Sequence, residues 1–392
     1  MDFYPASFYK LAHTRAGISF PLKYFRKTPG RHRPPLTPVI PALTLAARRF
    51  HITGRCSLIA STLPQYALPA MVTESSSNAT TVDEAIREAA RILRAGGLVV
   101  FPTETVYGLG ANALDPIAVR KIYALKGRPS TSPLIVHVAS IEQARQLAAE
   151  WLPEAESLAR KYWPGPLTLV VPKNPSIPDE VTAGLPTVGL RMPRHPIALA
   201  LLREAQIPIA APSANRFTQL SPTTAQHVRE AFGDETPFLL DGGPCEVGLE
   251  STVIAVTREG LEVLRPGMAF VEQATSSANA TPANAPSTVT PLPGAHRSPG
   301  QHRKHYSPRT RILLVNRGFL PAEGRGAYLW LSYNAKAARR LRMPERPEDY
   351  AAKLYSTLHD LDQKSFDWIA VELPPDETAW SAIRDRLIRA AY

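Results

Sequence analysis

The hydrophobic and polar positions of the chain follow two alternating periods from about residue 81 to residue 270. Short apolar runs rich in β-branched residues predict buried strands at 98–101, 133–138, 166–171, 187–191, 207–211, 238–240, 251–256 and 261–265. Apolar residues spaced three and four apart predict helices between them, at 81–95, 116–125, 153–162, 196–205 and 221–232, and one after Ser140. The alternation predicts one α/β domain of about 190 residues.

Several of these helices begin with a recognisable capping signal. A hydroxyl residue three positions before Glu or Gln forms a capping box, and Asp or Ser before proline places Pro at the first helical position. We therefore expect helix starts at Thr81 with Glu84, Ser140 with Gln143, Asp115 with Pro116, and Ser221 with Pro222.

The sequence on either side of this domain has a different composition. Residues 1–80 predict a disordered, basic and proline-rich leader, which is either not translated, with Met71 as the start, or a targeting segment. Residues 271–308 are rich in Ala, Pro, Ser and Thr and predict a flexible linker. A small second α/β domain is predicted over 309–392, with strands at 311–315, 327–332 and 368–371 and helices at 347–362 and 379–390.

The net charge of +11 is concentrated in the leader. Residues 1–70 hold ten of the 45 Lys and Arg residues but one of the 34 Asp and Glu residues, so the rest of the chain is nearly neutral. The charge therefore says little about partners of the folded part. No apolar run approaches the length of a transmembrane helix, and the two cysteines form neither a disulfide framework nor a metal motif. We expect a cytoplasmic protein.

Polar residues are delivered at the end of the first predicted strand. Thr103, Glu104 and Thr105 follow it at once, and Gly108 and Gly110 then indicate a tight turn or a close approach of the backbone. Polar groups at the end of a hydrophobic strand are a common way for an α/β protein to build a site. An ordinary turn is the alternative interpretation.

Four cations occur at comparable places. Lys126 and Arg128 lie in a Gly-Pro loop after a helix, while Arg191 and Arg265 each end a strand just before proline. Arginine presents a fork suited to carboxylate or phosphate, but a solvated helix end or a structural ion pair would also explain such residues. His137, within an apolar strand, is either a ligand contact or a satisfied core residue. Further polar groups at strand ends are Ser213 and Asn215 in PSAN, and Glu250, Ser251 and Thr252 in GLEST.

The motifs that would point to a standard nucleotide or metal enzyme are missing from the sequence. There is no GxxxxGK[ST] loop, no GxGxxG between a strand and a helix, and no HExxH. Several strand ends instead carry Thr, Ser, Asn, Lys and Arg, with few carboxylates and no nucleophile–base pair. Such a cavity suits an anionic nucleotide together with a zwitterion, and it would act by positioning and charge neutralisation.

Taken together, the motifs resemble one family. FPTETVYGLG, KGRP followed by SPLIVHV, WPGPLTLV, VGLRMP, APSAN, SPT, GLESTVI and LRPG occur in the order found in YrdC-like domains. With HYSP in the linker and a second domain behind it, the chain resembles the long form of the threonylcarbamoyl-AMP synthase family. The resemblance implies a YrdC-like twisted, open, mixed sheet with flanking helices, a linker, and a small Rossmann-like α/β C-terminal domain.

The resemblance also implies a reaction and its site. The family is a nucleotidyltransferase that condenses L-threonine, bicarbonate and ATP to threonylcarbamoyl-AMP and pyrophosphate, for threonylcarbamoyladenosine modification of tRNA. By motif, L-threonine would be bound by Thr105, His137, Arg191, Ala211 and Ser251. ATP would be bound by Arg128, Ser132, Thr187, Ser213, Asn215, Ser221, Arg265 and Tyr306. The catalytic cations would be Lys126 and Arg128.

The remaining expectations concern cofactors and partners. Mg²⁺ is expected to arrive on the ATP phosphates, with no ligand from a protein side chain, and the linker is expected to act as a lid over a labile product. The product would pass to a tRNA threonylcarbamoyl-transferase complex, and weak RNA binding is expected. Two other functions remain open: a YrdC-like RNA-binding module, and a carbamoyl-transfer maturation factor.

Overall fold

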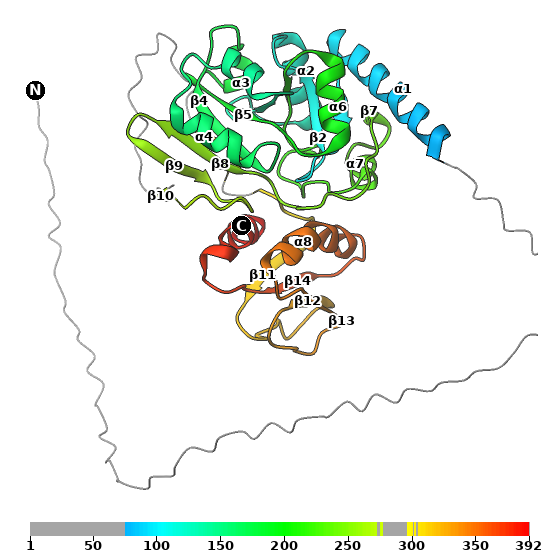
Figure 1. Ribbon diagram of the computed structural model, residues 1–392. Helices are drawn as coiled ribbons and strands as arrows, with labels where there is room; N and C mark the ends of the chain where they lie inside the picture. The colour runs from blue at the N-terminus through cyan, green and yellow to red at the C-terminus, as the bar shows by residue number, and fades with distance from the viewer. Residues whose placement is uncertain (1–74, 273–274, 277–295, 301, 303–304, 392) are drawn as a thin grey trace, which may run out of the picture. The chain divides into compact units, whose positions relative to one another are not determined.

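The structure is a computed structural model that describes residues 75–272, 275–276, 296–300, 302 and 305–391 (Figure 1). The predicted leader therefore lies outside the described residues up to position 74, as does most of the predicted linker. Within the described ranges, no helix combines the length and the apolar character that crossing a membrane requires.

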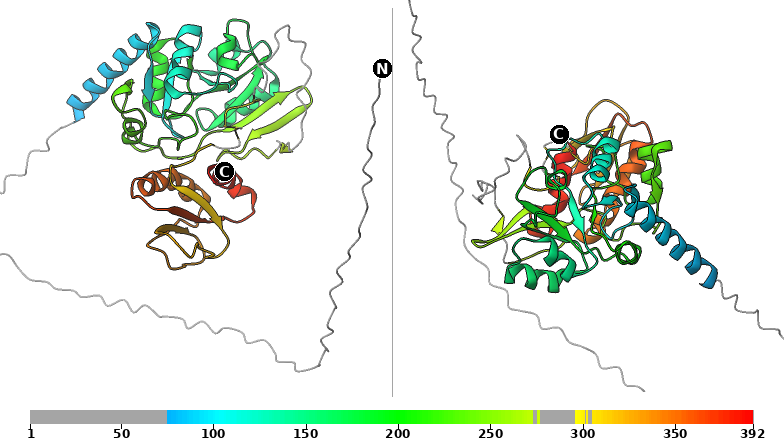
Figure 2. Two further views of the ribbon diagram at one scale, coloured as in Figure 1. Left: turned by 180° about the vertical axis from the view of Figure 1, so that it is seen from behind. Right: turned by 90° about the horizontal axis from the view of Figure 1, so that it is seen from above.

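Most of the described chain forms a ten-stranded mixed sheet with helices on both faces (Figures 1 and 2). The strand order is β10-β9-β8-β4-β5-β3-β6-β2-β1-β7. The strands are β1 (Val99–Phe101), β2 (Gly108–Asn112), β3 (Ile135–His137), β4 (Leu167–Pro172), β5 (Thr187–Arg191), β6 (Ile209–Ala210), β7 (Phe238–Leu239), β8 (Thr252–Thr257), β9 (Gly260–Arg265) and β10 (Thr275–Ser276). The predicted fold class, a mixed open sheet with flanking helices, is confirmed.

The helices divide into two layers. One apolar core lies between the sheet and α1 with α6, and a larger core lies on the side of α2, α3, α4 and α7. Their bounds are α1 (Ser75–Arg94), α2 (Pro116–Lys126), α3 (Ile141–Leu147), α4 (Pro153–Tyr162), α5 (Asp179–Thr182), α6 (Pro196–Ala205) and α7 (Ala225–Phe232). Each layer buries one apolar stripe of a helix against the sheet, which is how a helix gains most of its stability.

Two predicted helix starts are wrong. Helix α1 already begins at Ser75, so Thr81 and Glu84 lie inside it and do not mark its start. Helix α7 begins at Ala225 because Thr224 caps it by accepting from the amide of His227, 3.2 Å away. The predicted N-cap Ser221 therefore does not cap this helix. Its hydroxyl instead donates a hydrogen bond to Glu250. The start with Asp115 before Pro116 is confirmed.

Gly108 and Gly110, expected either in a tight turn or at a close approach of the backbone, lie in strand β2. Strand β2 runs antiparallel to β1 and places Gly110 opposite Val99. A Cβ atom on Gly110 would lie 2.8 Å from Ile209 Cγ2 and 2.9 Å from Phe101 Cε1, closer than real side-chain contacts. The expected close approach of backbone is therefore correct, and it is an approach to the core.

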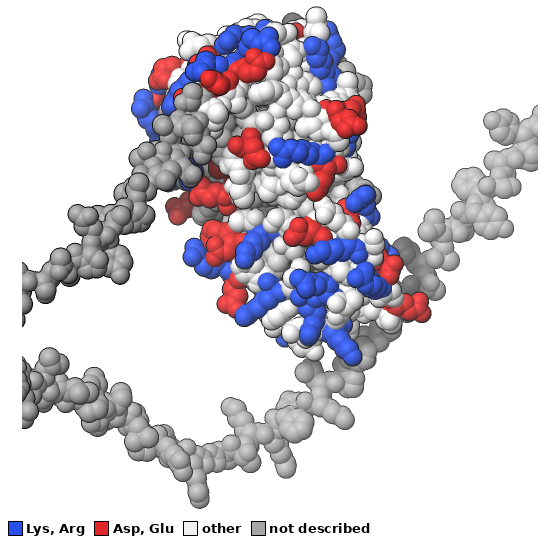
Figure 3. Space-filling model, turned by 90° about the vertical axis from the view of Figure 1, so that its right-hand side faces the viewer, with Lys and Arg blue, Asp and Glu red and all other residues white. Residues whose placement is uncertain are grey.

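A second, parallel sheet follows the linker, in the order β11-β14-β12-β13. Its elements are β11 (Arg311–Val315), β12 (Gly326–Trp330), β13 (Arg339–Arg342), α8 (Pro347–Asp362), β14 (Trp368–Glu372), a 3₁₀ turn (Thr378–Trp380) and α9 (Ser381–Ala390). Strand β13 was not predicted, because its sequence RRLR lacks an apolar run. It is an edge strand, where charged side chains discourage pairing with another chain. Figure 3 shows Lys and Arg gathered over this part of the molecule.

Candidate active site

A small cavity of about 50 Å³ lies where several strands of the large sheet end. All five residues predicted to bind threonine line it: Thr105, His137, Arg191, Ala211 and Ser251. Four of the eight predicted ATP contacts line it as well: Arg128, Ser213, Arg265 and Tyr306. The structure thus brings together residues that are up to about 200 positions apart in the sequence.

The sheet explains why two of the predicted threonine contacts are neighbours. Strands β3 and β5 are parallel and adjacent, and their register pairs His137 with Arg191. Because both residues are the last of their strands, their side chains emerge at the same edge of the sheet. This juxtaposition follows from topology and could not be derived from the sequence spacing alone.

A buried ion pair orients Arg191. Its Nη2 lies 2.8 Å from Oε1 of Glu104, and the second carboxylate oxygen accepts from the amide of Arg194 at 2.9 Å. Glu104 and Arg191 are only 2% and 4% exposed. Burial alone would raise the pKa of Glu104, but the charge and hydrogen bond of Arg191 hold that pKa below its usual value. Glu104 therefore fixes the guanidinium, a role that the sequence did not assign to it.

The turn that carries Glu104 is held by its two threonines. Thr103 donates from Oγ1 to the carbonyl of Val106 at 2.6 Å and accepts from the amides of Thr105 and Val106, each at 3.2 Å. Such side-chain hydrogen bonds replace the strand ladder after Pro102. The hydroxyl of Thr105 lies 2.9 Å from that of Thr103 and faces the cavity wall. The motif is thus a rigid turn at the rim of the site.

His137 is buried with one ring atom unsatisfied. Its Nδ1 has no hydrogen-bond partner in the described part of the chain, and the edge of the Phe101 ring packs against it at a centroid distance of 5.7 Å. Burial, with the nearby charge of Arg191, lowers the pKa of His137 to about 3, so the ring is neutral. A buried polar atom that lacks a partner and lines a cavity marks a place where a ligand would bind. The unpaired Nδ1 favours a ligand contact over a fully satisfied core histidine, and the role of His137 stays a prediction.

The other end of the cavity holds buried cations. Arg265 donates from Nε and Nη2 to the carbonyl of Ser251, at 3.1 and 2.9 Å, and Arg128 donates from Nη2 to the carbonyl of Pro133 at 3.1 Å. Arg128 Nε has no partner among the described residues, and neither arginine forms an ion pair with a carboxylate there. Burial lowers the pKa of both, yet a guanidinium stays charged at any physiological pH.

Lys126 is not among the residues that line the cavity. Its Nζ donates to the carbonyl of Ser213 at 2.6 Å and to the carbonyl of Asn215. It is 2% exposed, and burial lowers its pKa well below the usual value. In this arrangement Lys126 holds the PSAN loop, and its part in the chemistry stays a prediction. Asn215 itself donates from its amide to the carbonyls of Arg216 and Gln219.

The remaining predicted ATP contacts do not line the cavity. Ser221 and Ser132 are hydrogen-bonded to other side chains: Ser221 donates from Oγ to Glu250 at 2.5 Å, and Ser132 Oγ lies 2.5 Å from Nε2 of His302. Thr187 lines a second, neighbouring cavity with Arg297. Their roles in binding ATP stay predictions.

A segment from the linker region covers the cation end of the cavity. We call residues 296–300, 302 and 305–307 the strap. Its Pro299 accepts from Arg265 Nη1 at 3.2 Å, and Tyr306, 1% exposed, adopts a left-handed φ of 60°. Gly300 has a left-handed φ of 83°, and a Cβ atom there would lie 2.2 Å from the Tyr306 hydroxyl, so a larger residue would be strained at this position. Pockets for ligands of nucleotide size are typically about 300–1,000 Å³, so the strap fills space that such a ligand would need.

Two family models match the chain side by side. The model described as telomere recombination, for the Sua5, YciO and YrdC proteins, matches residues 91–267. The model described as the C-terminal domain of threonylcarbamoyl-AMP synthase matches residues 256–392. The fold and its cavity thus belong to the Sua5 and YrdC class of α/β proteins, in its two-domain form.

Individual relatives narrow this class. The threonylcarbamoyl-AMP synthase of Pyrococcus abyssi is 39% identical over 78% of this chain and 94% of its own length, and that of Bacillus subtilis is 39% identical over 80% and 94%. The crystal structure of P. abyssi Sua5 complexed with L-threonine superposes with a TM-score of 0.70 at 36% identity, over 79% of this chain and 94% of that one. The chain belongs to the threonylcarbamoyl-AMP synthase family.

Proposed function

We propose that this protein is an L-threonylcarbamoyladenylate synthase, which condenses L-threonine, bicarbonate and ATP to threonylcarbamoyl-AMP and pyrophosphate. Family membership supports the activity, and the P. abyssi Sua5 structure contains L-threonine. The single observation that carries the proposal in this chain is a cavity with two buried arginines, Arg128 and Arg265, that have no carboxylate partner among the described residues. Buried charges of this kind are costly unless a ligand balances them.

Threonine would occupy the end that is built on β3 and β5. Its carboxylate would bind the face of Arg191 that Glu104 leaves open, in a charge-assisted hydrogen bond. The unsatisfied Nδ1 of neutral His137 and the hydroxyls of Thr105 and Ser251 would bind its remaining polar groups. A neutral histidine is suitable here, because its ring nitrogen can accept a hydrogen bond from the ammonium group of incoming threonine, whereas a charged ring has no acceptor and would repel that group.

The reaction would take place between the two ends. The free amine of threonine forms an N–C bond to CO₂ derived from bicarbonate, which gives a carbamate after loss of a proton. A carbamate oxygen then attacks the α-phosphorus of ATP in line, and the bond to the bridging oxygen breaks with pyrophosphate as leaving group. Arg128 and Arg265 would neutralise the charge that grows on the phosphates, while Lys126 keeps the PSAN loop in place.

Mg²⁺ would enter with ATP as part of the substrate. The two carboxylates nearest the reacting groups, Glu104 and Glu250, are both bound by arginines. They are therefore poor candidates for metal ligands, and phosphate oxygens would supply the coordination. The strap would have to move for ATP to enter and would then shield the mixed anhydride from water.

The product would be consumed by an enzyme complex that transfers the threonylcarbamoyl group to tRNA. Weak RNA binding stays a prediction, and the exposed arginines of β13, Arg339, Arg340 and Arg342, are where we expect it. Such binding would weaken steeply as salt increases, and replacing these arginines would abolish that dependence without affecting the synthesis of the adenylate.

The activity can be tested with purified protein, ATP and Mg²⁺. Pyrophosphate release should require both L-threonine and bicarbonate, and mass spectrometry should detect threonylcarbamoyl-AMP. Serine, which lacks the methyl group, and D-threonine serve as controls for the amino-acid end. Pyrophosphate release that is independent of threonine would overturn the proposal.

A further inference from the structure

We infer that helix α9 of the C-terminal domain is a positioning element of the active site: Arg386 fixes the cavity carboxylate Glu250, and Arg389 holds the strap. The family comparison assigns the C-terminal domain no task at the cavity. The inference rests on the proposed function for its kinetic test, whereas its second test needs no substrate.

The cavity wall that contains Glu250 is built against the C-terminal domain. A Cβ atom on Gly248 would lie 2.7 Å from Cα of Ala352 on α8, so the two backbones touch. The next residue, Leu249, is fully buried in the hydrophobic core of the C-terminal domain, together with Val106 and Leu220 of the large domain. Backbone contact at Gly248 and burial of Leu249 therefore already fix the segment GLES against the C-terminal domain, without any ionic contact.

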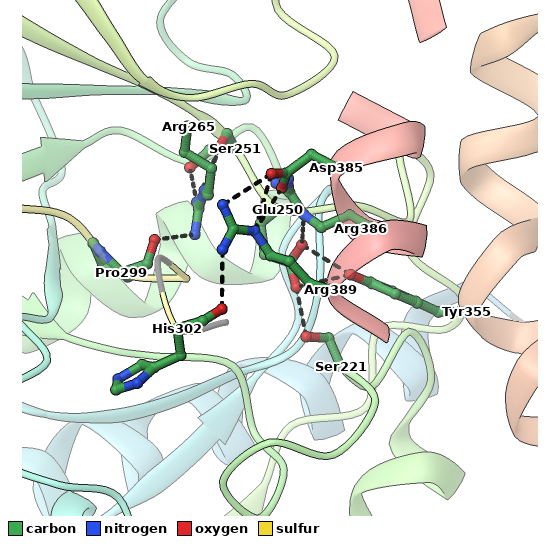
Figure 4. A network of polar contacts seen from close by, with 10 residues as sticks. All are labelled: Ser221, Glu250, Ser251, Arg265, Pro299, His302, Tyr355, Asp385, Arg386 and Arg389. Atoms are coloured by element: carbon green, nitrogen blue, oxygen red, sulfur yellow. Dashed lines mark hydrogen bonds and ion pairs between the residues drawn. The ribbon is translucent and has the colours of Figure 1, made fainter. Parts of the chain in front are cut away.

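Glu250 is then bound by three side chains (Figure 4). Arg386 donates from Nε to Oε2 at 2.8 Å, Tyr355 of α8 donates from its hydroxyl at 3.1 Å, and Ser221 donates to Oε1 at 2.5 Å. Arg386 is completely buried. Two of the three partners come from the C-terminal domain, while the third is a predicted ATP contact. Next along the chain, Ser251 is a predicted threonine contact.

The charge of Arg386 has a consequence for Arg265. Burial alone would raise the pKa of Glu250, but Arg386 and then Arg265 hold that pKa below its usual value. The charges of both arginines thus stabilise the ionised form of Glu250, although its ion pair is with Arg386. Without Arg386, Arg265 would be the main remaining cation that acts on the carboxylate, which would then compete with phosphate for Arg265. Arg386 therefore leaves Arg265 available to the polyphosphate.

The same helix holds the strap. Arg389 donates from Nη1 to the carbonyl of His302 at 2.9 Å, and the carbonyl of Arg389 accepts from the amide of His305 at 3.2 Å. Asp385 joins the two arginines, at 2.7 Å from Arg386 Nη1 and 3.0 Å from Arg389 Nε. The guanidinium of Arg386 also lies over the ring of Tyr306, 5.2 Å from its centroid. One turn of α9 thus contacts both a wall and the cover of the cavity.

The kinetic test replaces Arg386→Met, which keeps much of the volume. We expect the KM for ATP to rise at least tenfold, with a smaller change in the KM for threonine. The double variant Arg386→Met with Glu250→Gln removes the stranded charge and should recover a large part of the lost ATP affinity. The matched control is Arg384→Met on the same helix and should leave both KM values unchanged, because the polar contacts of Arg384 within the described residues are with Pro374 and Asp376 of its own domain.

The second test uses Arg389→Gln, whose side chain is partly exposed and therefore a safer change for folding. Without any substrate, trypsin should cleave at Arg297, within the strap, or at Arg309, just after it, at least fivefold faster in this variant than in the unmodified protein or in Arg384→Met. Cleavage sites are mapped by mass spectrometry. An unchanged rate of strap cleavage, or a double variant no better than Arg386→Met at equal folded fraction, would overturn the inference. An inactive unmodified protein with normal strap protection would instead count against the proposed function alone.

Discussion

The two ends of the cavity balance their charges differently. At the end that we propose for threonine, Arg191 has its counter-ion Glu104 within the same domain, and both are almost fully buried. At the nucleotide end, Arg128 and Arg265 have no carboxylate partner among the described residues, and the nearby Glu250 is bound by Arg386 from another domain. One end is therefore complete before its ligand binds, whereas the other relies on its ligand for neutrality.

This difference matches the ligands that we propose. A zwitterion brings no net charge, so its site must be neutral as a whole and needs only an oriented arginine. A polyphosphate brings several negative charges, so its site gains from cations that are buried and uncompensated. Before the ligand binds, these buried cations destabilise the protein. Burial accordingly lowers the pKa of Lys126, Arg128 and Arg265.

The largest effect is expected from Glu104→Gln, which breaks the balanced end. It leaves Arg191 buried without a counter-ion, which costs about 3–5 kcal/mol of unfolding free energy. Denaturant unfolding measures this loss. Threonine should restore more stability to the variant than to the unmodified protein, because its carboxylate becomes the missing partner.

Glu246→Gln is the matched control for that change. Glu246 forms an ion pair with Arg194 at 2.8 Å, but its side chain is 73% exposed. An exposed pair of this kind contributes about 0–1 kcal/mol. Equal losses of unfolding free energy in the two variants would show that the buried pair contributes no more than an exposed one. That result would contradict the proposed difference between the two ends of the cavity.

At the other end, Arg128→Met should have the opposite pattern. Removing an uncompensated buried cation should leave the unfolding free energy within about 1 kcal/mol of its original value, or raise it. The affinity for ATP should fall about 30- to 100-fold, which corresponds to the roughly 2–3 kcal/mol of a charged hydrogen bond. Isothermal titration should find the affinity for threonine nearly unchanged. The control is Arg120→Met, because Arg120 lies on the exposed side of α2 and pairs with Glu180. If Arg120→Met lowered the affinity for ATP as much as Arg128→Met, the assignment of Arg128 would be contradicted.

The sequence predicted this site unevenly. The strand ends and their polar residues were correct, because an apolar run that stops at Pro102 or after Arg191 is visible in one dimension. The pairing of His137 with Arg191 depends on which strands are neighbours, and that information is long-range. The sequence named Glu104 and Glu250 only as polar residues, because their partners lie 87 and 136 positions away.

The errors have the same physical origin. Strand β13 was missed because an edge strand of arginines has no hydrophobic period, and it forms only because β12 offers a parallel partner. Ser221 was predicted as a helix cap because Ser-Pro is a local signal, but tertiary contact won: its hydroxyl is bound by Glu250 instead. Local patterns predicted elements well, and only the assembled sheet could say which residues meet.

The smallest of the three effects concerns acid. The pKa of His137 is lowered to about 3 by burial, while an unfolded histidine has a pKa of about 6.5. Below pH 6.5 the unfolded chain binds a proton that the native state does not, so stability falls by about 1.4 kcal/mol per pH unit for this residue, and the loss continues down to the folded pKa. Between pH 6.5 and 5, above the range in which Glu104 and Glu250 titrate, the free energy of unfolding should fall by about 2 kcal/mol because of His137. In His137→Gln this part of the pH dependence should be absent. Burial also lowers the pKa of His302, on the strap, to about 4, so the same linkage predicts that His302→Gln removes a similar part of the slope above pH 5. A clearly smaller effect would show that the strap opens locally and lets His302 bind its proton in the folded protein. A slope that responds equally to both variants would mean that the strap is as firmly part of the folded core as the threonine end is.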